Sequence, residues 1–298
     1  MKIASRRARS SRTLKSLSTL ALAVMAAFCV AAPASATPIL GANLASFAVL
    51  GAAGVTNVPV STIGGNLGSA PNPSTGGGYI FTSGSLQGNT ILAQNAQLEL
   101  DAAIVALSAF GVGTTITGGD LDAFQALNGG SISPGIYTVP AAPVNLTGGL
   151  VLDGGGSNSA LWVFQFPATL ITSTTSTVTV QNVGDGSNVG LYWNVRSDAT
   201  LNGPTFAGNV LAHALISSDG NLTIACGRLL SATTQVTLIQ DSVSITGCAG
   251  ASGGFDQHVA IGSGGTGGSN GQVVPEPGTL ALLGLGLAGL GFVRRRQG

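Results

Sequence analysis

The sequence predicts a mainly β protein built from stacked β-coils. Between Pro143 and Thr246, very short runs of β-branched and aromatic residues alternate with turns of Gly, Asn, Asp, Ser and Thr, recurring roughly every 10 to 20 residues. Asn-Gly and Asp-Gly pairs bounded by alternating strands, which mark tight hairpins, are rare in these turns; the exceptions are Asp185-Gly186 and Asp219-Gly220. A β-sandwich would also give many evenly spaced strands, so the turns favour the stacked arrangement without requiring it.

The expected strands are too short for amphipathic helices, and small polar residues flank nearly every one, as stacked coils need where the chain turns a corner. In this stretch they cover residues 150–152, 161–166, 177–180, 191–195, 209–212, 222–224 and 236–239. Residues 40–51, 55–57 and 61–68 have the same character, so we expect the N-terminal part to add coils to the same body. The Pro and Gly cluster at 69–78 predicts a loop.

One long helix is predicted at about residues 89–110. Asn89 or Thr90 can cap its start and Gly111 can end it. A single helix with one apolar stripe does not fold alone, so we expect it to lie along a wall of the β-structure. The stripe that repeats at helical spacing consists of Leu92, Ala96, Leu100, Ala103, Leu107 and Phe110.

Charge is segregated along the chain. Of the 298 residues 44% are hydrophobic and only 7% charged, which excludes a disordered polyelectrolyte. The basic residues gather at the two ends, whereas all acidic residues lie between Glu99 and Glu276. Between the ends only Arg196 and Arg228 are basic, so the body would repel nucleic acid and anionic lipid, and no nucleic-acid partner is expected.

The first 36 residues read as an export signal. A basic start is followed by the apolar run 17–32 and by the small residues Ala34 and Ala36, which a signal peptidase would recognise. We expect cleavage after Ala36 and a mature β-domain at 37–250.

The C-terminal part changes character. Residues 251–273 form a Gly- and Ser-rich linker. Residues 274–298 resemble the PEP-CTERM sorting signal, with Pro275, Glu276 and Pro277 before an apolar run and a basic end at Arg294, Arg295 and Arg296. The resemblance implies cleavage by an exosortase-type membrane enzyme and delivery to the surface of a Gram-negative cell that makes exopolysaccharide. The run would span only about 23 Å as a helix, which suits a transient membrane stop.

Other chemical sites are weakly indicated. Cys226 and Cys248 can form a disulfide after export, or stay as two separate thiols. His213 and His258 lack ligand spacing, so no metal and no cofactor is expected. No Gly-x-Ser-x-Gly elbow appears between a strand and a helix, and polysaccharide lyases built on β-helices need clustered carboxylates and basic residues, so we do not expect an enzyme.

A series of segments resembles the microbial ice-binding family. They follow in the family's order over residues 40–247 and are Ser46 to Leu50, Val55-Thr56-Asn57, Ile132 to Tyr137, Leu146 to Asp153, Trp162 to Phe166, Tyr192 to Val195, Phe206 to Ala212 and Gly227 to Leu230. The resemblance implies an irregular right-handed parallel β-helix of triangular section with one long helix alongside.

The resemblance also implies a flat face that adsorbs to an ice crystal, with Thr-Ala/Gly-x-Thr/Asn motifs in the more potent members. Matching positions here are degenerate: Thr172 to Thr175, Asn202 to Thr205, and Asp219 to Leu222. The candidate contacts are Thr172, Thr174, Thr175, Thr200, Asn202, Thr205 and Asn221. Alternatively these residues satisfy turns and exposed strand faces, and the chain is a matrix or adhesion protein that contacts exopolysaccharide.

Overall fold

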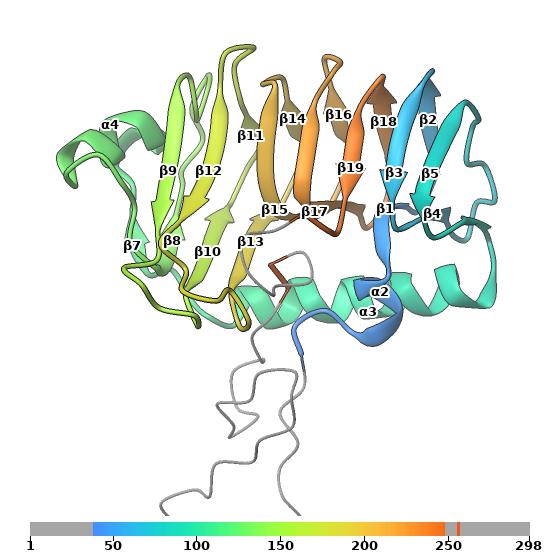
Figure 1. Ribbon diagram of the computed structural model, residues 1–298, viewed down its shortest axis with the longest axis horizontal. Helices are drawn as coiled ribbons and strands as arrows, with labels where there is room; N and C mark the ends of the chain where they lie inside the picture. Colours follow the sequence, from blue (N-terminus) through green and yellow to red (C-terminus); the bar gives the residue numbers. More distant parts are fainter. Residues whose placement is uncertain (1–37, 248–254, 257–298) are drawn as a thin grey trace, which may run out of the picture. The chain divides into compact units, whose positions relative to one another are not determined.

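The chain winds through successive coils whose strands stack in parallel on those of the neighbouring coils (Figure 1). The computed structural model describes residues 38–247 and 255–256. Every ladder between named strands in these residues is parallel. The predicted β-helix is therefore confirmed, and the sandwich is excluded because it would need antiparallel pairs. The export signal, the sorting signal, Cys248 and the predicted linker apart from Phe255 and Asp256 lie outside the described residues.

The strands form three walls. One wall, which we call the five-stranded wall, is a separate sheet. It contains, in spatial order, β11 (Leu170–Ile171), β14 (Ala199–Leu201), β16 (Ile216–Ser218), β18 (Gln235–Ile239) and β2 (Gly54–Val58).

The second wall, the seven-stranded wall, faces the viewer in Figure 1. Its strands are β9 (Gly149–Asp153), β12 (Thr177–Gln181), the first part of β15 (Thr205–Ala212), the first part of β17 (Thr223–Ser231), β19 (Ser242–Ser244), β3 (Ser61–Gly64) and β5 (Tyr79–Ser83).

The third wall lies under the long helix, and we call it the helix wall. It shares β15 and β17 with the seven-stranded wall, because both long strands bend from one wall into the other. Its other strands are β7 (Thr114–Thr115), β8 (Gly135–Thr138), β10 (Leu161–Phe166), β13 (Gly190–Val195), β1 (Phe47–Gly51), β4 (Asn66–Ser69) and β6 (Leu86–Gly88).

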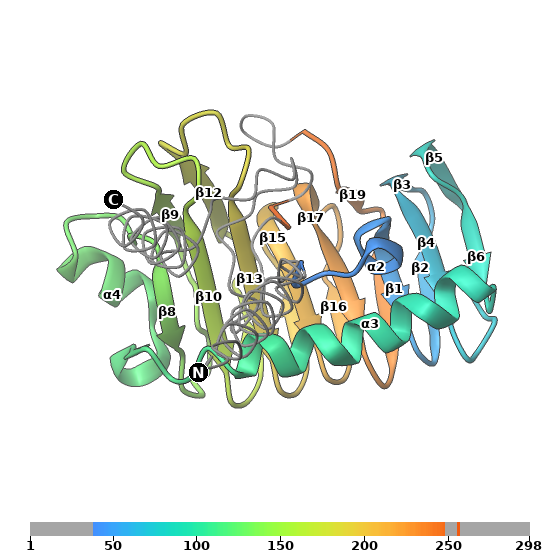
Figure 2. The same cartoon turned by 90° about the horizontal axis from the view of Figure 1, so that it is seen from below.

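The coils are not stacked in sequence order. The N-terminal coil joins the last one, since β1 pairs with β17, β2 with β18 and β3 with β19. From there the chain builds outward to β5 and β6, and helix α3 (Ile91–Ser108) then carries it along the stack to the far end (Figure 2). The remaining coils fill the space from that end back to the first coil.

Helix α3 agrees with the predicted helix. The Thr90 hydroxyl caps it by accepting from the Ala93 N–H at 3.3 Å, and Ala93, Ala96, Leu100, Ala103 and Leu107 are its buried residues. Three short helices were not predicted: the first lies in a segment read as strands and turns, and the other two lie in a segment for which no element was predicted. They are α2 (Ala42–Ala45), the 3-10 turn Thr117–Gly119 and α4 (Leu121–Leu127), which lies beside β9 at one end of the stack.

The interior is filled by inward side chains of all three walls. Tyr137, Phe164 and Trp193 stack on one another along the stack axis, with ring centroids 5.3 and 4.5 Å apart. The indole N–H groups of Trp162 and Trp193 donate to the carbonyls of Ile132 and Ala207. Because these donors are satisfied, both large rings can be buried completely, which stiffens the walls around them.

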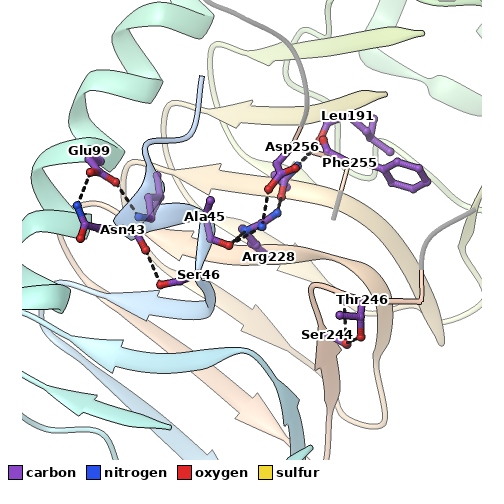
Figure 3. Close-up of polar contacts among 12 residues, drawn as sticks. Asn43, Ala45, Ser46, Glu99, Leu191, Arg228, Ser244, Thr246, Phe255 and Asp256 are labelled. Atoms are coloured by element: carbon purple, nitrogen blue, oxygen red, sulfur yellow. Dashed lines mark hydrogen bonds and ion pairs between the residues drawn. The ribbon is translucent and has the colours of Figure 1, made fainter. Parts of the chain in front are cut away.

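A buried arginine ties distant parts of the chain together (Figure 3). The Arg228 guanidinium donates to the Ala45 carbonyl at 2.6 Å, to Asn209 Oδ1 at 2.8 Å and to Asp256 Oδ2 at 2.7 Å. Burial lowers the pKa of Arg228, and the Asp256 carboxylate opposes that shift. Phe255 is buried, and its carbonyl accepts from the Leu191 N–H. These contacts hold residues 255–256 against the helix wall, away from the five-stranded wall.

Candidate functional site

The outward side of the five-stranded wall carries one row of five side chains, four of which are small hydroxyl residues, while the fifth, at one end, is Ile171. Each residue pairs in register with the next, so the row runs straight across all five strands. The two hydroxyls of Thr56 and Thr237 are 3.0 Å apart. In spatial order the row is Ile171, Thr200, Ser217, Thr237 and Thr56, all partly or fully exposed.

The inward side of the same strands explains why the row is rigid. Leu170, Ala199, Ile216, Val236 and Val55 alternate with the row and are completely buried. The ladders of this sheet contain no register shift. A sheet with fully packed inner side chains and unbroken pairing presents its outer row at the regular strand spacing of about 4.8 Å.

Charged groups stay at the borders of this wall. Asp198 precedes β14 and accepts from the Leu215 N–H at 2.8 Å, and Asp219 follows β16 at the opposite corner. The central row itself contains no ionisable side chain. A surface of hydroxyl and methyl groups without charge can order water without a strongly hydrated ion disturbing it.

The corner between the five-stranded and seven-stranded walls contains a buried carboxyl group. Asp241 accepts from the Ser218 hydroxyl at 2.6 Å and from the N–H groups of Leu222 and Ile239 at 3.0 Å. Burial raises the pKa of Asp241, although these hydrogen bonds lower it in part. The carboxyl group therefore fixes the corner that defines one edge of the hydroxyl row.

The seven-stranded wall also carries a row in register, but its surface is broken. The row consists of Gly149, Thr177, Thr205, Thr223, Ser242, Thr62 and Ile80. Strands β12 and β15 pair only at Thr177 and Thr205, and beyond that point they diverge. The gap between them is a cavity of about 290 Å³ with Val178, Phe206, Cys226 and Phe255 in its lining.

Three of the predicted contacts lie on or next to an outward row. Thr200 is in the hydroxyl row of the five-stranded wall, and Asn202 directly follows the same strand. Thr205 belongs to the row of the seven-stranded wall. The structure therefore divides these three candidates between two walls.

The other four candidates lie elsewhere. Thr172 is only 1% exposed, and its hydroxyl accepts from the Asn202 N–H at 2.9 Å, so it cannot reach an external surface. Thr174 and Thr175 are exposed in a turn at the corner, where the Thr175 hydroxyl donates to the Thr147 carbonyl. Asn221 has a left-handed φ of 59° at another corner. These residues shape turns.

The Gly in the motif-like segment at Asn202 has a packing role. A Cβ atom on Gly203 would lie 2.1 Å from the Ser176 carbonyl oxygen of the neighbouring coil. No side chain fits at that distance. The resemblance of this segment to the family motif thus marks a tight corner, rather than an extra surface contact.

Sequence reasoning missed Ser217, Thr237 and Thr56 as members of one row. The alternation of inward and outward residues along each strand could have identified them as outward-facing. Each of the three stands between two residues of its strand that point inward or to the edge of the wall. Their alignment depends on which strands become neighbours. Thr56 and Thr237 are separated by 181 positions and meet only because the first coil joins the last.

Two predicted features lie at or beyond the limit of the described residues. Cys226 is disulfide-bonded, whereas Cys248 is outside the described residues, so their pairing stays a prediction. The sorting residues Pro275, Glu276, Pro277, Arg294, Arg295 and Arg296 also lie outside, as do Ala34 and Ala36. Among the helices that the structure describes, none combines the length and the apolar character needed to cross a membrane.

Comparison with known proteins gives two family matches and several relatives. The model of the Ice-binding-like family matches residues 49–244, and that of the PEP-CTERM protein-sorting motif matches residues 273–296. An ice-binding protein of Nostoc sp. (strain HG1) is 34% identical over 287 residues, covering 93% of this chain and 94% of that protein. One from Flammulina populicola is 27% identical over 231 residues, covering 72% and 91%.

Solved structures agree with these matches. The crystal structure of an ice-binding protein from the Antarctic ascomycete Antarctomyces psychrotrophicus superposes with a TM-score of 0.58 at 28% identity, covering 72% of this chain and all of the other. A glycosylated ice-binding protein from an Arctic yeast has the same TM-score at 21% identity, which supports the fold alone. With most of the described residues inside the matched range, the chain belongs to the Ice-binding-like family.

Proposed function

We propose that this protein binds ice, and that the five-stranded wall is the surface that adsorbs. The observation that carries the proposal is the unbroken row of Thr200, Ser217, Thr237 and Thr56 on a separate sheet without register shifts. The relatives described above are named for ice binding, which supports the activity but does not choose the wall.

Adsorption to a crystal needs many weak contacts at fixed spacing. Threonine offers a hydroxyl that hydrogen-bonds to water and a methyl group beside which the first-shell water molecules are restricted in orientation. On stacked strands these groups repeat at about 4.8 Å, and the χ1 angle of Thr is stiff, so little side-chain freedom is lost on binding. A rigid row can therefore hold a water layer in a repeating pattern that matches ice.

Flatness favours this wall over the seven-stranded one. A crystal face cannot follow the divergence of β12 from β15 or enter the cavity between them. The ladder of β3 with β5 also shifts register between Ile63 and Gly64. On the five-stranded wall the corresponding ladders continue without interruption.

We also propose that the protein acts without catalysis, is exported, and is sorted to the cell surface or the extracellular matrix. The match to the PEP-CTERM motif supports sorting by an exosortase-type enzyme. Release of the export signal by a signal peptidase and contact with exopolysaccharide follow from this route. Residues 255–256 contact Arg228 and Leu191 of the helix wall, not the five-stranded wall.

The test is ice affinity purification with thermal hysteresis on residues 37–273. The variant Thr200→Tyr with Thr237→Tyr places two large rings on the row and should lose most of its partition into ice. Thr205→Tyr with Thr223→Tyr on the seven-stranded wall is the matched control and should keep it. Circular dichroism checks that both variants are folded.

Two results would contradict the proposal in different ways. If the control pair loses ice partition and the first pair keeps it, the protein binds ice through the other wall. If the folded wild-type protein is excluded from ice, the fold has lost the activity, and binding to exopolysaccharide becomes the function to measure.

A further inference from the structure

The outer side of α3 carries an exposed apolar stripe. Ile91, Leu98, Val105 and Val112 are 71, 69, 69 and 70% exposed and follow one another at intervals of seven residues. Ile91, Leu98 and Val105 lie within the helix, and Val112 follows it. The opposite side of the same helix packs on the helix wall, so this stripe is not part of the core.

Small residues fill the positions between the large ones. Asn95, Ala102 and Ala109 are exposed and stand four residues after Ile91, Leu98 and Val105 in turn. Large and small residues that alternate at intervals of four and three are the pattern of a coiled-coil seam. An exposed stripe of this kind is uncommon on a protein that stays monomeric.

We propose that the stripe is a homodimer contact in which α3 of two copies pair antiparallel about a twofold axis. In this register Leu98 lies beside Ala102 of the second copy, Ile91 beside Ala109, and Val105 beside Asn95. Each large side chain thus meets a small one, and the two helices can approach closely. The same residues serve both copies, as an isologous interface requires.

The area is enough for a weak but specific dimer. The four large side chains, each about 70% exposed, and the alanines between them would bury roughly 500 Å² per copy, or about 1,000 Å² in all. This is near the lower limit for specific association, so we expect a dissociation constant in the micromolar range. A much larger, permanent interface is not expected.

Asp101 distinguishes an antiparallel pair of helices from a parallel one. It is exposed beside the middle of the stripe, next to Ala102. Antiparallel pairing about the proposed axis brings the two Asp101 carboxylates close together, and their repulsion weakens the dimer. In a parallel pair of helices the two Asp101 carboxylates would lie on opposite sides of the seam and therefore farther apart.

The dimer would leave the hydroxyl rows free. Helix α3 covers the helix wall, and the five-stranded wall is a different side of the molecule (Figures 1 and 2). Two copies joined through α3 would each expose their own row, so the pair would be bivalent toward ice. The dimer itself does not depend on whether ice binding is correct.

Sedimentation velocity of residues 37–273 from about 1 to 200 µM tests the dimer. We expect the wild-type sedimentation coefficient to rise with concentration. Leu98→Glu with Val105→Glu should remain monomeric throughout, and Asp101→Asn should dimerise several-fold more tightly. Leu127→Glu is the matched control: Leu127 is 87% exposed but belongs to α4, so this change should leave the dimer intact.

A cross-link tests the register. Leu98→Cys with Ala102→Cys should give a covalent dimer under mild oxidation, because Leu98 of one copy lies beside Ala102 of the other in this register, whereas Ala102→Cys alone and Leu127→Cys should not. A wild-type protein that stays monomeric at the highest concentration overturns the proposal. A protein that stays monomeric but binds neutral lipid vesicles through the stripe also overturns it, because the stripe would then fit a lipid surface. The same holds if residues 37–273 stay monomeric and only the chain extended to residue 298 dimerises, because the stripe would then fit the chain's own apolar segment.

Discussion

The five-stranded and seven-stranded walls are built by the same coils, yet only the first has ladders without interruption. Both alternate buried apolar residues with outward Thr and Ser. The five-stranded wall ends in turns on both sides, so its sheet is independent of the others. The seven-stranded wall shares β15 and β17 with the helix wall and must follow their bend.

The bend depends on two glycines. Gly208 and Gly227 have φ of 90° and 156°, and they pair with each other where the ladder of β15 and β17 shifts register. A Cβ on Gly227 would lie 1.9 Å from the Gly208 carbonyl oxygen. The comparison teaches that a surface row requires more than suitable side chains, because the connection of a wall to its neighbours decides whether the row is straight.

The largest expected effect comes from blocking that bend. Gly227→Ala introduces both the backbone clash and an unfavourable φ, and should lower the free energy of unfolding by about 3 to 5 kcal/mol. Gly149→Ala is the control, because its Cβ would meet Thr177 Oγ1 at an ordinary 3.4 Å. Urea denaturation checks both. Equal stability of the two variants would show that the bend tolerates a side chain.

A smaller effect is expected at Thr172, the buried candidate. Thr172→Val removes the acceptor of the Asn202 N–H and should cost about 1 to 3 kcal/mol of unfolding free energy. Thr174→Val, in the exposed turn of the same segment, should change stability by less than about 0.5 kcal/mol. Thermal unfolding of both variants tests this order of destabilisation. A larger loss of stability in Thr174→Val than in Thr172→Val would contradict the buried position of Thr172.

The corner between the two walls should show a pH dependence. The pKa of Asp241 is raised in the folded protein, so the folded state binds a proton more tightly than the unfolded state. The contribution of Asp241 to stability is therefore highest below its unfolded pKa and declines as pH rises through its folded pKa. In Asp241→Asn this dependence is absent.

Urea midpoints at pH 7 and at pH 4 measure it. The wild type should gain stability relative to Asp241→Asn on acidification, because all other carboxyl groups are common to both proteins. If the wild type instead loses stability relative to Asp241→Asn between pH 7 and pH 4, the hydrogen bonds from Ser218, Leu222 and Ile239 outweigh the effect of burial on the pKa of Asp241.

The smallest expected effect is a gain on the hydroxyl row. Ser217→Thr adds a methyl group between Thr200 and Thr237 and should raise thermal hysteresis by less than about twofold. Ser242→Thr makes the same change on the seven-stranded wall and should leave it unaltered. A gain only from Ser242→Thr would reverse the roles of the two walls.

The fold could be predicted from the sequence because its determinants are local. Short apolar runs with polar turns gave the coils, and the apolar stripe from Ala96 to Leu107 gave α3. The short helix α2 was missed because four residues carry no helical periodicity and its position depends on tertiary contacts. Those contacts include the Glu99 carboxylate, which accepts from the Asn43 side chain and the Leu44 N–H (Figure 3).

The candidate surface could be predicted only in part. Thr200 was among the predicted contacts but lies outside the three motif-like segments, and the motif itself led to Thr172, whose side chain is buried. One residue of register decides between the two outcomes, since successive side chains of a strand face opposite ways. Thr56 and Thr237 could not be joined from the sequence, because nothing local indicates that the first and last coils are neighbours.

The closure of the first coil on the last one also sets the order in which the stack can be completed. Strands β1, β2 and β3 have their partners on one side in β17, β18 and β19, which are the last strands that the structure describes. A chain that is still emerging from a ribosome or a translocon therefore holds an incomplete stack, with Thr56 apart from the rest of its row. The five-stranded wall, with β2 beside β18, is therefore complete only after the last described coil has been made.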